Sequence, residues 1–181
     1  KNPQLDDLYA ISKAILYPSD FKKSLDELVK VIRRVLIFDN LVAYRFDPNT
    51  LSLDVLYAKA MGRGKSAEAD VSWGENLANQ VVTTHEVISQ TPKEPLSQDR
   101  LQLAYSLGLP LMISDQNYGA LVFIRFGGPP FLPEHIEMGK FIADHLSWLL
   151  FHKIISEQIS HLEAQKHASQ LQEDFINTIT H

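Results

Sequence analysis

The last quarter of the sequence places the strongest limit on what this chain can fold into. Between Glu134 and His181 there is no proline and a single glycine, Gly139, and apolar residues return at the three- and four-residue intervals of a helix. At about 1.5 Å rise per residue, one continuous helix of this length would measure roughly 70 Å, about twice the width of any globular domain that the other residues could form. Most of it is therefore expected to lie outside its own domain, with apolar residues that need a partner.

The simplest partner for this helix is the same helix of a second chain, paired as a coiled coil. The apolar spacing is out of phase between Leu162 and Ala168, and such an offset changes the local winding of a coiled coil. It marks either a point where the helix register can change or a merely irregular coiled coil. The expected dimer interface consists of Ile155, Ile159, Leu162, Ala168, Leu171 and Phe175.

Another helix is predicted at the N-terminus, where Asn2 can act as the cap and Pro3 can occupy the first helical position. Its apolar residues run from Leu5 to Leu16, and Pro18 ends it. Because this apolar face has no other evident cover, we expect it to extend the dimer bundle beside the long helix. The predicted assembly is a homodimer held by its N- and C-terminal helices.

The composition excludes several classes of function. The chain has 181 residues and no cysteine, which excludes disulfides, thiolate metal sites and a thioether-linked chromophore. Its net charge of -5 and its scattered basic residues do not favour nucleic-acid binding. All histidines except His85 lie on the long helix at spacings that do not converge, so no metal site is predicted.

The sequence also lacks the features of a membrane protein. No stretch approaches about 18 consecutive apolar residues, and the N-terminus does not have the layout of a signal peptide. We therefore expect no membrane contact within this sequence and a cytoplasmic location. Since the sequence begins at Lys1 without a methionine, we expect it to be part of a longer protein, whose other segments could carry targeting signals.

The central part of the chain predicts an antiparallel sheet with helices before and after it, which is an α+β fold. The segment Ala120 to Ile124 is apolar on both faces, as expected of a central strand that is covered on both sides. The other strands alternate apolar and polar residues. The predicted elements are helices at 20–36 and from Gly74, strands at 42–46, 51–59, 87–89, 106–114 and 119–126, and a turn at 115–118.

Four short motifs within this region occur in the order that is typical of one family. Gly74 precedes a helix that ends in Thr83-Thr84-His85-Glu86-Val87, a strand ends in Pro110-Leu111, and Gly119 opens an apolar strand that is followed by Pro130-Phe131. The region resembles a GAF domain. The resemblance implies a central antiparallel sheet of about five to six strands, with the terminal helices on one face. The predicted domains are a dimer-bundle helix at 1–18, the GAF sensor domain at 19–151 and a coiled-coil linker helix at 152–181.

The resemblance also implies that loops and short helices on the second face of the sheet surround a possible ligand cavity. The same apolar side chains could instead fill a core, which leaves two alternatives: a bound small molecule or a domain that acts as a dimer scaffold. A cyclic nucleotide is disfavoured, because Glu75 would place an acid where its phosphate would sit. The expected lining consists of Tyr44, Phe46, Tyr57, Trp73, Leu77, Val81, Leu109 and Leu111.

The last residues carry a second resemblance. Phe175 lies six residues before His181, which follows Thr180, and this spacing resembles the start of the phosphoacceptor box of sensor histidine kinases. The acidic residue and the Leu, Arg, Thr and Pro that continue the box are not in this sequence. The resemblance implies that His181 receives a phosphoryl group from ATP, with Mg²⁺ bound to the ATP, in the complete protein. His181 would then pass this group to a response regulator receiver domain.

This sequence contains no ATP-binding motif of its own, so the kinase activity would belong to the complete protein. Three alternatives remain open at this point. His181 can be a solvent-facing helical residue without a chemical role. The chain can also belong to a non-enzymatic dimeric regulator of transcription or cyclic-nucleotide signalling, or serve as a structural dimer scaffold.

Overall fold

The computed structural model describes residues 6–11, 20–61, 72–94 and 96–180, and for Ser72 and Trp73 the backbone only. By its internal contacts the chain divides into two compact units, Lys1–Leu149 and Leu150–His181. The first unit holds the sheet and its covering helices, and the second is helical throughout its described part. Residues 6–11 are helical, as predicted for the N-terminal segment, and the rest of that predicted helix lies outside the described residues.

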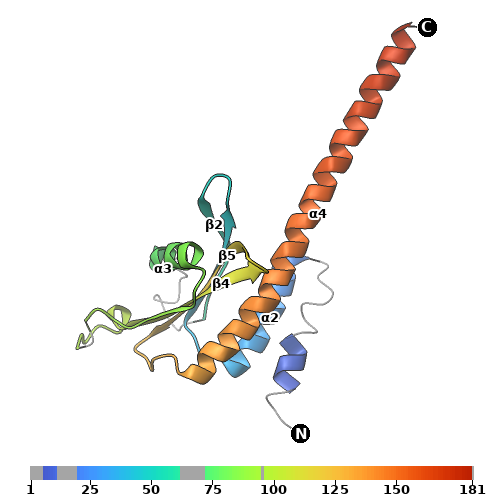
Figure 1. Cartoon of the computed structure of the whole chain (residues 1–181). Coiled ribbons are helices and arrows are strands. Elements are labelled where there is room, and N and C mark those ends of the chain that lie inside the picture. The colour runs from blue at the N-terminus through green and yellow to red at the C-terminus, as the bar shows by residue number, and fades with distance from the viewer. Residues whose placement is uncertain (1–5, 12–19, 62–71, 95, 181) are drawn as a thin grey trace. The chain divides into compact units, whose positions relative to one another are not determined.

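The first unit is built on a five-stranded antiparallel sheet with the strand order β2-β1-β5-β4-β3 (Figure 1). This confirms the predicted fold class. Strand β5 lies at the centre and is buried on both faces from Ala120 to Ile124, because its side chains there are apolar on both sides. The strands are β1 (Asn40–Asp47), β2 (Ser52–Ala60), β3 (Ile88–Gln90), β4 (Ala104–Ile113) and β5 (Gln116–Phe126).

Helix α2 (Phe21–Val35) and the first part of helix α4 (Pro133–Thr180) cover one face of the sheet. Asp20 caps α2 by accepting hydrogen bonds from the backbone N–H groups of Lys22 and Lys23. Side chains of both helices, among them Ile32 and Ile142, enclose a narrow apolar gap with strands β1, β2 and β5. Helix α3 (Ser72–Thr84) packs on the opposite face, and the short 3-10 helix η2 (Arg100–Gln102) precedes β4.

The hairpin between β4 and β5 is tighter than predicted. Its turn consists of Ser114, whose φ is 51°, and Asp115, whereas the sequence predicted a turn at 115–118. Ile113 already pairs with Gln116, and Met112 with Asn117. The polar residues at 115–118 suggested a longer turn, but Asn117 is buried in the strand, where its amide donates to the backbone oxygen of Gly119 at 3.1 Å.

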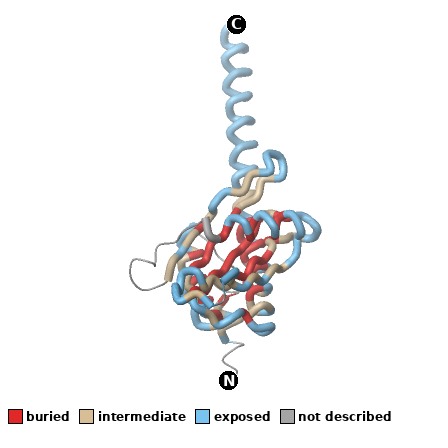
Figure 2. Tube along the Cα trace, turned by 90° about the vertical axis from the view of Figure 1, so that its left-hand side faces the viewer, coloured by how far each residue is buried: buried red, intermediate tan, exposed pale blue. Residues whose placement is uncertain are grey.

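Helix α4 is continuous over 48 residues, as predicted from the absence of proline. In the second unit every described residue from Ser156 to Thr180 is exposed (Figure 2). Large apolar side chains such as Leu162 and Phe175 are among them, 63% and 65% exposed. A helix of this composition leaves its apolar residues without cover in a single chain.

Candidate functional site

The face of the sheet beneath α3 carries half of the predicted cavity lining. Tyr44, Leu77 and Val81 are buried in one cluster with Val42 and Val122, and Phe46 packs against it. Gly74 of α3 lies so close that an added Cβ would be 3.0 Å from the Tyr44 hydroxyl oxygen. Trp73 belongs to the same helix, but its side chain lies outside the described part of the structure.

The other predicted lining residues lie on the opposite face of the sheet. The residues expected to line one cavity are therefore divided between the two faces. The Tyr57 hydroxyl donates to the Asp26 carboxylate of α2 at 2.6 Å. Burial is the main cause that raises the pKa of the Tyr57 phenol, and this hydrogen bond raises it further. Leu109 lies against Gly139 of α4, where an added Cβ would be 3.2 Å from its side chain. Leu111 follows two residues along β4 and is also fully buried.

Two local features explain this division. The register of β1 and β2 shifts between Ala43 and Tyr44, which leaves Leu56 as an extra residue and moves Tyr57 to the other face. In β4, Gly108 faces α3, because a Cβ there would lie 2.7 Å from the side chain of Val81. The alternation of a strand then turns Leu109 away from α3. A simple alternation through the whole hairpin cannot reveal such a bulge.

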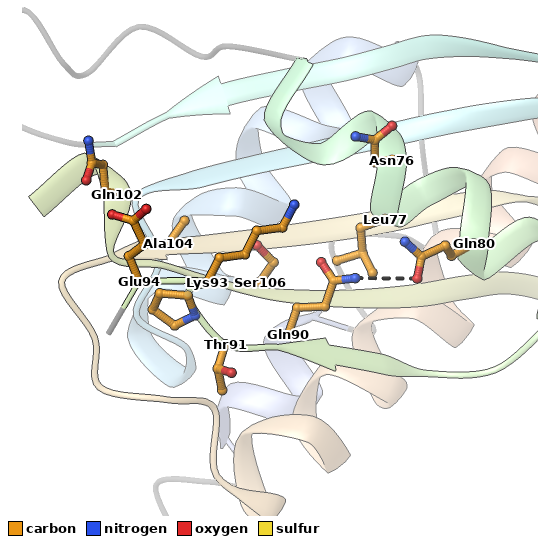
Figure 3. A pocket seen from close by; sticks show the side chains of 11 residues that line it. Asn76, Leu77, Gln80, Gln90, Thr91, Lys93, Glu94, Gln102, Ala104 and Ser106 are labelled. Carbon is orange, nitrogen blue, oxygen red and sulfur yellow. Dashed lines mark hydrogen bonds between the residues drawn. The ribbon is translucent and has the colours of Figure 1, made fainter. Parts of the chain in front are cut away.

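An open pocket of about 750 Å³ lies beside the cluster, between α3, the strands β3 and β4, and the segment that joins them (Figure 3). Of the predicted lining residues whose side chains the structure describes, only Leu77 belongs to it. The other residues of the pocket were not predicted, because they are mostly polar residues of a loop and of exposed helix positions, which have no periodic pattern. The pocket is lined by Asn76, Leu77, Gln80, Gln90, Thr91, Pro92, Lys93, Glu94, Gln102, Ala104 and Ser106.

The chemistry of this pocket suits a small polar molecule. Its side-chain amides both donate and accept hydrogen bonds. Figure 3 shows the amides of Gln80 and Gln90 turned toward each other. The Gln90 Nε2 donates to the Gln80 Oε1 at 3.4 Å. Lys93 and Glu94 add one charge of each sign. The volume lies in the range of pockets that hold small ligands, which are usually more apolar than this one.

Beside the pocket, the backbone of Phe126 is held from two sides in an arrangement that we call the Phe126 clamp. One carboxylate oxygen of Asp39 accepts from the Phe126 N–H at 2.7 Å, and the other accepts from the Arg100 guanidinium at 3.2 Å. The Arg100 Nε donates to the Phe126 carbonyl oxygen at 3.0 Å. Asp39 and Arg100 thereby fix both hydrogen-bonding groups of the last residue of β5.

Arg125 holds the segment that leads from β5 into α4. Its side chain is buried, with Nε donating to the Ile37 carbonyl at 2.6 Å and Nη1 to the carbonyls of Pro129 and Pro130 at 3.2 and 3.3 Å. The guanidinium lies 4.1 Å from the centre of the Phe131 ring. Burial lowers the pKa of Arg125, and the Asp39 carboxylate opposes this shift.

The start of α4 carries one further polar contact. The Nδ1 atom of His135 accepts a hydrogen bond from the Leu132 N–H at 3.1 Å. Burial lowers the pKa of His135, as does the charge of Arg125, whereas Glu134 raises it. Burial and the charge of Arg125 therefore favour the neutral imidazole that this hydrogen bond requires.

The predicted dimer residues of α4 lie along its exposed part, apart from Ile155, which is half-buried. Because α4 is unbroken, the offset in apolar spacing persists, and residues twelve apart such as Ile159 and Leu171 point about 120° away from each other. Ile176, which the predicted interface omitted, is also exposed. His181 lies outside the described residues.

The antiparallel sheet with helices on both faces defines an α+β domain, and comparison with known proteins places the chain in a family. The sequence profile of the GAF domain matches residues 20–150, so the chain belongs to the GAF domain family. GAF domains are sensory and regulatory modules of many signalling proteins. No curated protein sequence matches the chain.

Solved structures show the same fold. The GAF domain of an Acinetobacter phosphoenolpyruvate-protein phosphotransferase is 19% identical, with a TM-score of 0.68 over 87% of this chain and 99% of that one. The corresponding domain from Coxiella burnetii is also 19% identical and covers the same shares, with a TM-score of 0.66. The GAF3 domain of Slr1393 from Synechocystis is 17% identical, with a TM-score of 0.56 over 77% of this chain and 99% of that one.

The described residues carry neither a membrane-spanning helix nor a group of metal ligands. None of the helices there combines the length and apolar content that a membrane crossing requires. In the same ranges, no three histidine, aspartate or glutamate side chains group as metal ligands.

Proposed function

We propose that this chain is the sensory GAF domain and linker helix of a cytoplasmic sensor histidine kinase. The observation that carries the proposal is the sequence Phe175 to Thr180-His181 at the end of a continuous 48-residue helix with exposed apolar residues. Paired α4 helices of a homodimer would connect the GAF domain with His181. A small polar molecule would be the signal, bound in the pocket between α3, β3 and β4, which we call the α3 pocket.

In the complete protein, one imidazole nitrogen of His181 attacks the γ-phosphoryl group of Mg²⁺-bound ATP, and ADP leaves. The phosphoryl group then passes to an aspartate of a response regulator receiver domain. Imidazole suits this role because its ring is largely neutral near pH 7 and therefore has a free nitrogen lone pair. The GAF domain regulates the reaction by changing how the two α4 helices pack.

The proposal is tested by incubating the complete protein with radiolabelled ATP and Mg²⁺. We expect an acid-labile phosphate on wild type and its loss, by at least 100-fold, in His181→Gln. The matched control is His167→Gln, since this exposed histidine of α4 should not affect labelling. Absence of label from wild type, or label that persists in His181→Gln, would contradict the proposal.

A second candidate function is a non-enzymatic dimeric regulator. It is favoured by the variety of proteins that carry similar GAF domains, such as the phosphotransferases above and a GAF and HD domain protein from Geobacter sulfurreducens. In that case the same pocket and helix would serve another output domain. The labelling experiment separates the two candidates.

A further inference from the structure

The segment from η2 to the start of β4, residues 100–104, belongs to two sites at once. Gln102 and Ala104 line the α3 pocket, and Arg100, two residues before Gln102, forms the Phe126 clamp with Asp39. Leu103 lies between the two pocket residues and accepts a hydrogen bond from the Gly127 N–H at 2.9 Å. A displacement of this short segment by a molecule in the pocket therefore acts directly on the end of β5.

The contacts of Arg100 are of the kind that can be released. Its side chain is 62% exposed, and exposed ion pairs contribute little to stability because water replaces them readily. Asp39 would keep its bond to the Phe126 N–H after such a release, so the carboxylate would not be left without a partner. Asp99 caps η2 by accepting from the Leu101 N–H, which keeps the short helix together as it moves.

Arg125 differs from Arg100 because its side chain is buried and its contacts cannot be exchanged for water. It joins the Ile37 carbonyl, the carbonyls of Pro129 and Pro130, and the ring of Phe131 into one unit directly before Pro133, where α4 begins. Since Arg125 and Phe126 are adjacent, a shift of the Phe126 backbone moves this unit. The exposed arginine is thus the releasable contact and the buried arginine the rigid one.

Resting on the proposed function, we propose that the Phe126 clamp is the connection through which the α3 pocket controls the start of α4. Arg100 is the coupling residue, because its side chain bridges the pocket segment to both Asp39 and Phe126. Arg125 transmits the movement to the segment before α4. To establish this role, an experiment must show that a change at the α3 pocket alters the start of α4 through Arg100, because closeness in space alone does not demonstrate coupling.

Hydrogen exchange tests this role without knowledge of the natural ligand. Gln102→Trp places a bulky side chain at the pocket and serves as the probe. We expect it to change amide exchange at Phe126, Gly127 and the first turn of α4 by at least fivefold. In an Arg100→Gln background the same probe should cause less than half of that change, since the Arg100 contacts are gone and only the Leu103–Gly127 bond and the pairing of β4 with β5 remain. Arg33→Gln, which removes an exposed arginine of α2, is the matched control background and should preserve the probe's full effect.

Equal effects of the probe in the Arg100→Gln and Arg33→Gln backgrounds would overturn the proposal, and so would the lack of any effect in wild type. A merely structural role of Arg100 predicts that same equal effect together with a lower melting temperature. The exchange experiment does not depend on phosphorylation. A labelled His181 with failed coupling therefore contradicts this inference alone, whereas coupling without label contradicts the kinase assignment alone.

Discussion

Replacing Gly119 with alanine is expected to lower the stability of the sheet by about 3 kcal/mol, at the upper end of typical overpacking effects. Gly119 lies in the central strand β5 between Arg45 of β1 and Leu111 of β4. A Cβ at this position would lie 1.8 Å from the backbone oxygen of Tyr44. A backbone atom cannot rotate away as a side chain does, so β1 and β5 would have to separate.

This loss should lower the melting temperature by about 10 °C, as measured by circular dichroism. Gly139→Ala is the matched control. There the added Cβ would meet a movable methyl group of Leu109 at 3.2 Å, and alanine favours the helix by about 1 kcal/mol. We expect its stability to stay within about 1 kcal/mol of wild type. If Gly119→Ala melts at the wild-type temperature, the strand arrangement at this position is wrong.

Replacing Ile159 with glutamate is expected to dissociate the proposed homodimer. Each dimer would bury two carboxylates in an apolar interface, where an unpaired charge is costly. We expect the dissociation constant to rise by at least about 100-fold, equivalent to roughly 3 kcal/mol. Light scattering should then give the mass of one chain at tens of micromolar, where wild type gives the mass of two.

Ser160→Glu is the control for this substitution. It adds the same charge one residue away, about 100° around the helix, at an exposed position. The control should remain a dimer. Dissociation of both variants, or of neither, would contradict the assigned interface.

Much of the fold was predictable because it follows from local patterns. The unbroken helix from Pro133 follows from the lack of proline, and the central position of β5 from its apolar residues on both faces. The turn at Ser114 and Asp115 was not predictable in detail, because the burial of Asn117 depends on the neighbouring strand. Tertiary contacts decide such positions, and they leave no local pattern.

The candidate site was predictable only in part. The apolar cluster of Tyr44, Leu77 and Val81 follows from helix and strand periodicity. The bulge that turns Tyr57 to the other face follows from strand pairing, which the residue pattern of β2 does not reveal. Arg100 and Asp39 are 61 residues apart, so their contact could not be foreseen from spacing.

Cysteine cross-linking tests most directly the central claim that two α4 helices pair to carry the signal. The chain has no cysteine, so a single introduced thiol reports one position without interference. In an interface position, Leu162→Cys should place two thiols within disulfide distance and give a covalent dimer on mild oxidation. Ser160→Cys, on another side of the helix, should cross-link at least tenfold less. Equal cross-linking at both positions, or none at Leu162→Cys at tens of micromolar protein, would contradict the paired helix.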